Sequence, residues 1–147
     1  MWHKDSIEWL DIELTSYCNI KCPGCLRQES HNKVEPLLNK SYTKLSDLKK
    51  WITADGLPNL KYINFCGSVD EPTSHPEILE IVDYFKSIVN GRSDNAGVNI
   101  ATNGSTRTPE FWAKLGKRRI SVFADQKTRK YLLSSFKYCF WLSIWLV

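Results

Sequence analysis

The chain has 147 residues, of which 42% are hydrophobic and 12% aromatic, so it carries enough apolar side chains for one folded domain and is not a disordered protein. Its net charge of +4 is unevenly placed, because residues 114–147 hold eight Lys and Arg against one acidic residue. Most aromatic residues of that region gather in an apolar terminal run instead of alternating with the basic ones, which argues against a nucleic-acid surface. The chain does not begin with the apolar segment of a signal peptide, and we expect a cytoplasmic protein.

The first predicted elements are a strand, two loops and a helix. The strand covers Ile7–Thr15, where apolar and acidic residues alternate with period two, and it leads into a cysteine-rich loop. Residues 27–40 are polar and lack periodicity, which predicts a long loop. The helical spacing of Leu45, Leu48 and Ile52 predicts a helix of about three turns.

The rest of the pattern continues to alternate. Strands are predicted over 60–66, 98–102 and 120–124, and helices over 74–89 and 108–116. Helices that join successive strands imply parallel strands with right-handed crossovers. The predicted fold class is therefore α/β, with about four parallel strands, and its site is expected where loops leave the carboxyl ends of the strands.

Three cysteines, Cys18, Cys22 and Cys25, stand at the spacing C-x3-C-x2-C. One tight loop can turn three such sulfurs toward one point, and intracellular thiols stay reduced, which favours metal ligation over a disulfide. Structural zinc takes four ligands, whereas a 4Fe-4S cluster held by three thiolates keeps one iron open for another molecule. The loop therefore predicts a metal or iron-sulfur site.

This motif and the strand before it resemble the radical S-adenosylmethionine (radical SAM) enzymes, whose three cysteines lie in the loop after the first barrel strand. The resemblance implies a partial (β/α) barrel, with a 4Fe-4S cluster on Cys18, Cys22 and Cys25 and with S-adenosylmethionine as second cofactor. It also implies reductive cleavage of S-adenosylmethionine to a 5′-deoxyadenosyl radical that abstracts a substrate hydrogen. An external electron donor, flavodoxin- or ferredoxin-like, is implied as a partner. The substrate, a small molecule or a peptide, is not specified by the sequence.

A second motif follows the strand predicted over 60–66. Gly67, Glu71 and Pro72 match the family segment that holds the methionine ammonium of the cofactor, while Asp70 stands where that segment has glycine. The resemblance assigns cofactor contacts to Gly67, Asp70 and Glu71. Weaker similarities extend to Asn103 after the third strand and to Asp125 after the fourth, where polar groups approach the cofactor ribose.

The resemblance ends near residue 125. We expect residues 1–125 to form a partial radical SAM core and residues 126–147 to form a divergent tail, basic and then apolar. The apolar run is shorter than the ~20 residues that span a bilayer. Because the family's fifth and sixth strands are not recognisable, we expect a truncated or frame-disrupted form of a longer enzyme.

Two alternatives remain open at this stage. The first is a zinc-stabilised binding module in which His31 or Cys66 completes the ligand set of the three cysteines, with the basic region contacting nucleic acid. The second is an inactive fragment that needs a partner chain. Iron and sulfide content against zinc content distinguishes the zinc module from a radical SAM enzyme.

Overall fold

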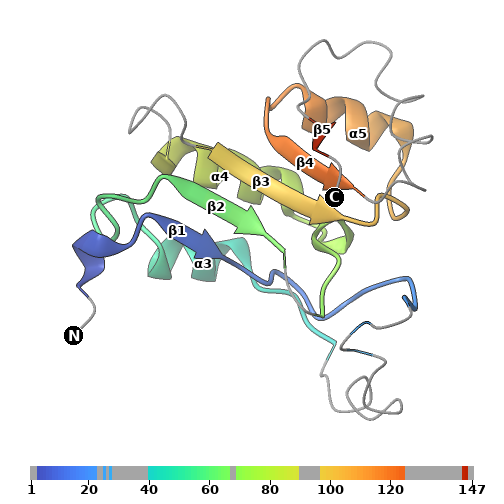
Figure 1. Cartoon of the computed structure of the whole chain (residues 1–147), viewed down its shortest axis with the longest axis horizontal. Coiled ribbons are helices and arrows are strands. Elements are labelled where there is room, and N and C mark those ends of the chain that lie inside the picture. Colours follow the sequence, from blue (N-terminus) through green and yellow to red (C-terminus); the bar gives the residue numbers. More distant parts are fainter. Residues whose placement is uncertain are drawn as a thin grey trace.

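The computed structural model describes residues 3–22, 25, 27, 40–66, 69–89, 97–124 and 144–145. Strands and helices alternate along these residues, as Figure 1 shows. The strands are β1 (Trp9–Asp11), β2 (Tyr62–Phe65), β3 (Gly97–Thr102), β4 (Ser121–Ala124) and β5 (Ile144–Trp145). The α-helices are α3 (Leu45–Trp51), α4 (Ile78–Val89) and α5 (Pro109–Gly116), and the 3-10 helices are η1 (Lys4–Ser6) and η2 (Pro72–Ser74).

The strands form one sheet in the order β1-β2-β3-β4-β5, and every neighbouring pair is parallel. Helices α3, α4 and α5 supply the crossovers after β1, β2 and β3, which is the connection that parallel neighbours require. Figure 1 shows α3 and α4 behind the sheet, so the opposite face is turned toward the viewer. The α/β class predicted from the sequence is confirmed, whereas closure into a partial barrel stays a prediction.

The core lies between the sheet and its helices because the strands alternate strictly. In β2, β3 and β4, every second residue is buried and the residues between are half-buried. Helix α4 turns six buried side chains toward this face, and Phe85 meets Phe65 edge to face at 5.5 Å between ring centroids. One face of the sheet is thus packed, and the other remains partly accessible.

Strand β1 is shorter than the predicted Ile7–Thr15. Its ladder with β2 ends near Asp11, after which the Ile12 amide donates to the Asn64 carbonyl at 2.9 Å. Beyond that point the Leu14 amide donates to the Asp70 side chain, and Thr15 pairs with Tyr42 in an isolated antiparallel bridge. Period two correctly placed the apolar residues, but contacts made by loops replace the ladder at its carboxyl end.

A further strand lies beyond the four that were predicted. Ile144–Trp145 pairs in parallel with Val122 and Phe123 of β4, so a piece of the region expected to diverge from the pattern joins the sheet. Every other residue of 126–147 lies outside the described residues. None of the helices in the described part of the chain has the length and apolarity that crossing a membrane requires.

Candidate cofactor site

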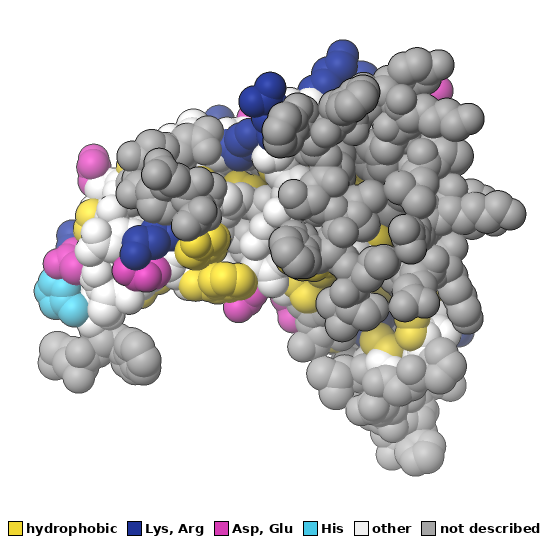
Figure 2. All heavy atoms as spheres, turned by 45° about the horizontal axis from the view of Figure 1, so that its top comes forward, with side chains coloured by type: hydrophobic (Ala, Val, Ile, Leu, Met, Phe, Trp, Pro, Cys, Tyr) yellow, Lys and Arg dark blue, Asp and Glu magenta, His cyan; other side chains and the backbone are white. Residues whose placement is uncertain are grey.

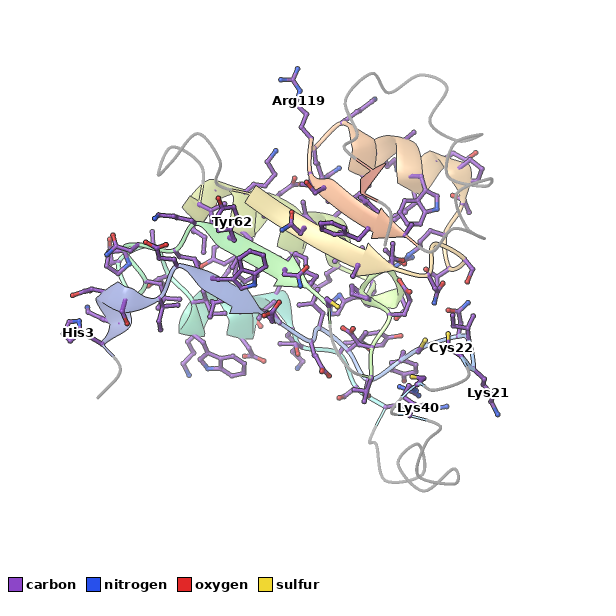
Figure 3. All side chains as sticks on the ribbon, viewed as in Figure 1. His3, Lys21, Cys22, Lys40, Tyr62 and Arg119 are labelled. Carbon is purple, nitrogen blue, oxygen red and sulfur yellow. The ribbon has the colours of Figure 1, made fainter. Side chains whose placement is uncertain are left out.

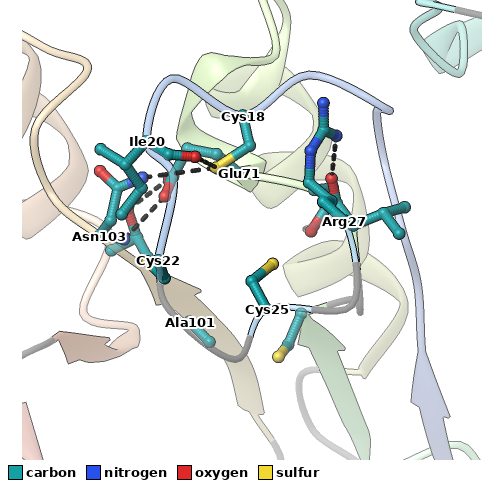
Figure 4. A pocket seen from close by; sticks show the side chains of 12 residues that line it. Cys18, Ile20, Cys22, Cys25, Arg27, Glu71, Ala101 and Asn103 are labelled. Atoms are coloured by element: carbon teal, nitrogen blue, oxygen red, sulfur yellow. Dashed lines mark hydrogen bonds between the residues drawn. The ribbon is translucent and has the colours of Figure 1, made fainter. Parts of the chain in front are cut away.

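Loops from the carboxyl ends of β1, β2 and β3 meet around a cavity of about 210 Å3. Figure 4 shows this cavity from close by, with residues far apart in the sequence arranged around it. The lining residues are Cys18, Ile20, Cys22, Cys25, Arg27, Cys66, Val69, Asp70, Glu71, Ala101, Thr102 and Asn103. The predicted convergence of the strand ends therefore holds for the first three strands.

The three cysteines of the motif all line this cavity, at different depths. Cys18 and Cys25 are half-buried and Cys22 is exposed. The Cys25 amide donates to the Cys22 carbonyl at 3.2 Å, which turns the chain between them. The Cys18 thiol donates to the Ile20 carbonyl at 3.8 Å, and burial raises the pKa of Cys18.

Among the described residues, no group of three His, Cys, Asp or Glu side chains is arranged to hold one metal ion. A single zinc ion needs every ligand atom at about 2.0–2.3 Å from one point. Cluster ligation spreads the thiolates over different irons, so it does not require that convergence. Three soft thiols around one cavity fit an iron-sulfur cluster better than a single ion. His31, proposed as a zinc ligand, lies outside the described residues.

Glu71 is fully buried in a hydrogen-bond network at the edge of the cavity. Its Oε1 accepts from the Thr73 amide at 3.1 Å, from the Thr73 hydroxyl at 2.5 Å and from the Thr102 hydroxyl. Its Oε2 accepts from the backbone amide of Asn103 at 2.7 Å. Because Glu71 is 2% exposed, these donors replace the water that an ionised carboxylate would otherwise need. The side chain fastens η2 to the end of β3.

Asp70, the neighbour of Glu71, is in a different position. Its Oδ2 accepts from the Leu14 amide at 3.0 Å, while its Oδ1 is buried without a hydrogen-bond partner among the described residues. Desolvation raises the pKa of Asp70 to about 7, opposed by backbone hydrogen bonding from Leu14 and Thr15 and reinforced by the charges of Glu13 and Glu71. Asp70 therefore lines the cavity with one carboxyl oxygen, Oδ1, that solvent does not reach.

Two positioning side chains were missed by the sequence analysis. Arg27 is 3% exposed and donates to the carbonyls of Ser16 at 2.7 Å and Val69 at 2.5 Å, so it fastens the cysteine loop to the loop after β2. Asn19 accepts from the Asn103 amide group at 2.9 Å, which fastens the same loop to the loop after β3. Neither residue belongs to a recognisable pattern, since each acts on a partner more than forty positions away.

The remaining predicted residues divide into two groups. Asn103 lines the cavity, and its Nδ2 also donates to Cys18 Sγ at 3.9 Å. Cys66 lines it as a fourth thiol, with a pKa that burial raises. The two others, Gly67 and Asp125, lie outside the described residues, so their assignments stay predictions.

Comparison with known proteins gives similarity to two kinds of cofactor-related protein. The tungsten-containing aldehyde ferredoxin oxidoreductase cofactor-modifying protein of Pyrococcus furiosus is 29% identical over 116 residues, which are 79% of this chain and 29% of that protein. The mycofactocin maturase MftC is 33% identical in Mycobacterium tuberculosis and 34% in Mycolicibacterium smegmatis, over 108 residues that are 72% of this chain and 24% of each maturase. These similarities support a radical SAM relationship.

The radical SAM relationship rests on part of each relative, because the chain spans between about a quarter and three tenths of the length of these curated proteins. No family model matches the chain, and no solved structure matches it. The alternative of a zinc-stabilised module is not favoured by these similarities. An enzymatic role is thus supported at a general level.

Proposed function

We propose that the chain provides the cluster-binding and cofactor-binding part of a radical SAM enzyme. The observation that carries the proposal is that one cavity brings together the three motif thiols and the polar side chains at the ends of β2 and β3. Cys18, Cys22 and Cys25 would hold three irons of a 4Fe-4S cluster, and the side of the cavity formed by Asp70, Glu71 and Asn103 would take S-adenosylmethionine. The relationship to the curated relatives supports both parts of this proposal.

The bound cluster would supply the electron that cleaves S-adenosylmethionine into methionine and a 5′-deoxyadenosyl radical. The chain itself positions the groups around that chemistry. Arg27 and Asn19 fasten the cysteine loop to the loops after β2 and β3, so the thiols and the carboxylates keep a fixed relation to each other. The buried Glu71 network holds the loops after β2 and β3 together behind the site.

The relatives' names point to a class of substrate. One relative is a cofactor-modifying protein and the other a maturase, so we propose a peptide or a cofactor precursor as the substrate of this chain as well. Reductive cleavage also needs an external one-electron donor, and we propose a small flavodoxin- or ferredoxin-like protein in that role.

The deciding experiment is anaerobic reconstitution of the 147-residue chain with iron and sulfide, followed by metal and sulfide analysis and by electron paramagnetic resonance of the reduced protein. One 4Fe-4S cluster is expected, and replacing Cys18, Cys22 or Cys25 with Ala should abolish it because each thiolate holds a separate iron. Cys66→Ala is the matched control, since Cys66 lines the same cavity but lies outside the motif. Stoichiometric zinc without iron-sulfur absorbance would contradict the proposal.

A further inference from the structure

A row of four polar side chains, here called the polar row, crosses the accessible face of the sheet. Asp11 of β1 lies opposite Asn64 of β2, Asn64 opposite Asn99 of β3, and Asn99 opposite Ser121 of β4. Neighbouring strands lie about 4.8 Å apart, so the row extends over about 14 Å. Asp11 is exposed and the three others are half-buried, and Figure 1 shows no described element in front of β1, β2 and β3. A ligand therefore has access to the polar row.

The polar row has unused hydrogen-bonding capacity. Asn64 donates through its Nδ2 to Asp11 at 2.7 Å. Among the described residues, the Asn64 Oδ1, the Asn99 side-chain amide and the Ser121 hydroxyl have no hydrogen-bond partner. A side-chain amide both donates and accepts, which is the same pair of groups that a peptide bond offers. Two neighbouring asparagines therefore match the backbone of a peptide.

Asp11 ends the polar row with a carboxylate whose orientation is fixed. Its Oδ1 accepts from Asn64 Nδ2 at 2.7 Å and from the Trp9 indole N–H at 3.2 Å. Its Oδ2 has no hydrogen-bond partner in the part of the chain that the structure describes. Asp11 is also the only charged residue in strands β1, β2, β3 and β4. The charge that these strands contribute to the face is therefore negative, and it favours a cationic ligand.

The aromatic rings beside Asp11 define which cation fits. Trp9 is 51% exposed, and its ring packs at a tilt against that of Tyr62, with 5.3 Å between the ring centroids. The long apolar stem of a lysine or arginine packs along such rings, and their faces attract its charged head. Lys61, the basic residue just before β2, is already paired with Glu8 at 2.6 Å. The position therefore fits a basic side chain that a ligand supplies.

The polar row lies next to the cavity. Ala101, two residues beyond Asn99 on the same face of β3, lines the cavity, and a strand advances about 7 Å over two residues. Cys66, two residues beyond Asn64, lines the cavity as well. A molecule that is held on the polar row is therefore within reach of a group bound in the cavity.

We infer that the polar row binds the substrate of this chain, and that this substrate is a peptide whose basic side chain pairs with Asp11. Asn64 and Asn99 bind the backbone amide groups next to that side chain, and the reacting part of the peptide lies toward the cavity. This role rests on the proposed function, because the cavity supplies the radical. Asp11 decides which peptides are accepted, whereas the two amides hold any extended peptide chain.

The first test is selection from a library of random peptides by the reconstituted 147-residue chain. We expect the bound peptides to be enriched in Lys or Arg, although the net charge of +4 would by itself attract acidic peptides. Asp11→Asn should abolish this enrichment, because it removes the charge but keeps an oxygen acceptor for Asn64 and Trp9. Asp55→Asn removes an exposed charge outside the sheet, and as the matched control it should keep the enrichment. Bound peptides without a basic preference would overturn the inference.

Calorimetric titration with a selected peptide then separates the two kinds of contact. With norleucine in place of its basic residue, the peptide should bind the wild-type chain about three- to tenfold more weakly, the effect of a cation at an exposed carboxylate and aromatic ring. Asp11→Asn should bind both peptides equally, and Asn99→Ala should weaken both by one factor because it removes a contact to the backbone.

Equal affinities of the two peptides for the wild-type chain, or self-association that blocks peptide binding, would overturn the inference and leave the proposed function standing. A chain that takes up no iron and sulfide but keeps the preference for basic peptides would overturn the proposed function and leave the binding surface standing.

Discussion

The neighbouring carboxyl groups of Asp70 and Glu71 at the cavity differ in how the folded chain replaces their water. Glu71 gains four backbone and hydroxyl donors when the chain folds, whereas Asp70 gains backbone hydrogen bonding from Leu14 and Thr15 and loses most of its water. Burial therefore raises the pKa of Asp70 from 3.8 to about 7. The folded protein holds a proton there that the unfolded chain releases at lower pH.

The raised pKa of Asp70 predicts a specific dependence of stability on pH. Its contribution to the free energy of unfolding is complete below about pH 4 and is lost as the pH rises through about 7, by at most about 1.4 kcal/mol per pH unit. Asp70→Asn mimics the protonated form and removes this contribution to the slope. Urea unfolding of both proteins from pH 4 to pH 8 measures the difference, and parallel curves would contradict the raised pKa.

At the scale of elements, threonine hydroxyls join η2 to the end of β3. The Thr73 hydroxyl lies 2.6 Å from that of Thr106 and 3.2 Å from that of Thr102, and Thr102 also accepts from the Gly104 amide at 2.9 Å. Thr102 thus connects the Glu71 carboxylate to the turn that follows β3. This network, and not a longer strand, holds the loop that carries Asn103.

Replacing Thr102 tests whether this network holds the site together. Thr102→Val keeps the shape of the side chain but removes the donor to Glu71 and the acceptor for Gly104, so we expect a loss of about 2–4 kcal/mol in the free energy of unfolding. Thr102→Ser keeps the hydroxyl and should lose less than half as much. Denaturant unfolding of the three proteins gives the values. A Val variant as stable as the wild-type protein would contradict the role given to the hydroxyl.

At the scale of the whole molecule, the sheet has one packed and one accessible face. Trp9 is 51% exposed on the accessible face, and its ring packs at a tilt against that of Tyr62 with 5.3 Å between the ring centroids. Beside them Asn64 donates to Asp11 at 2.7 Å. Hydrophobic side chains reach the surface among charged ones in Figure 2. Figure 3 places Tyr62 in the middle of the molecule and Cys22 at the end where the cavity lies. The accessible face of the sheet therefore extends from the cavity along the strands.

The accessible face predicts low activity for the 147-residue chain by itself. Among the described elements no second layer covers this side of the sheet, and we expect water at the site to weaken the positional and electrostatic control that cofactor cleavage needs. Cluster loading should persist, because its three ligands share one loop. The measurement is 5′-deoxyadenosine formed from S-adenosylmethionine after reduction with dithionite. Multiple turnovers by a monodisperse monomer would refute the expectation.

The sequence by itself determined the local features of this protein. Period two in the strands and helical spacing between them specified an α/β fold, because each pattern depends on neighbours within one element. Three cysteines in one short loop likewise predicted a ligand set, and all three line one cavity, whereas ligation stays a prediction. The length of β1 and the presence of β5 could not be predicted from the sequence. A strand ends where hydrogen bonds to a loop replace those to the neighbouring strand, and these partners lie far along the chain.

The roles of side chains around the cavity were decided by the tertiary structure alone. Sequence patterns cannot separate Asp70 from Glu71, because both are acidic residues in one motif. What separates them is contact with residues far along the chain: Leu14 for Asp70, Thr102 and Asn103 for Glu71. Arg27 is silent in the sequence for the same reason, as its partner Val69 lies forty-two positions away. Such hydrogen-bond partners are a property of the folded chain, because they come from residues that are distant in the sequence.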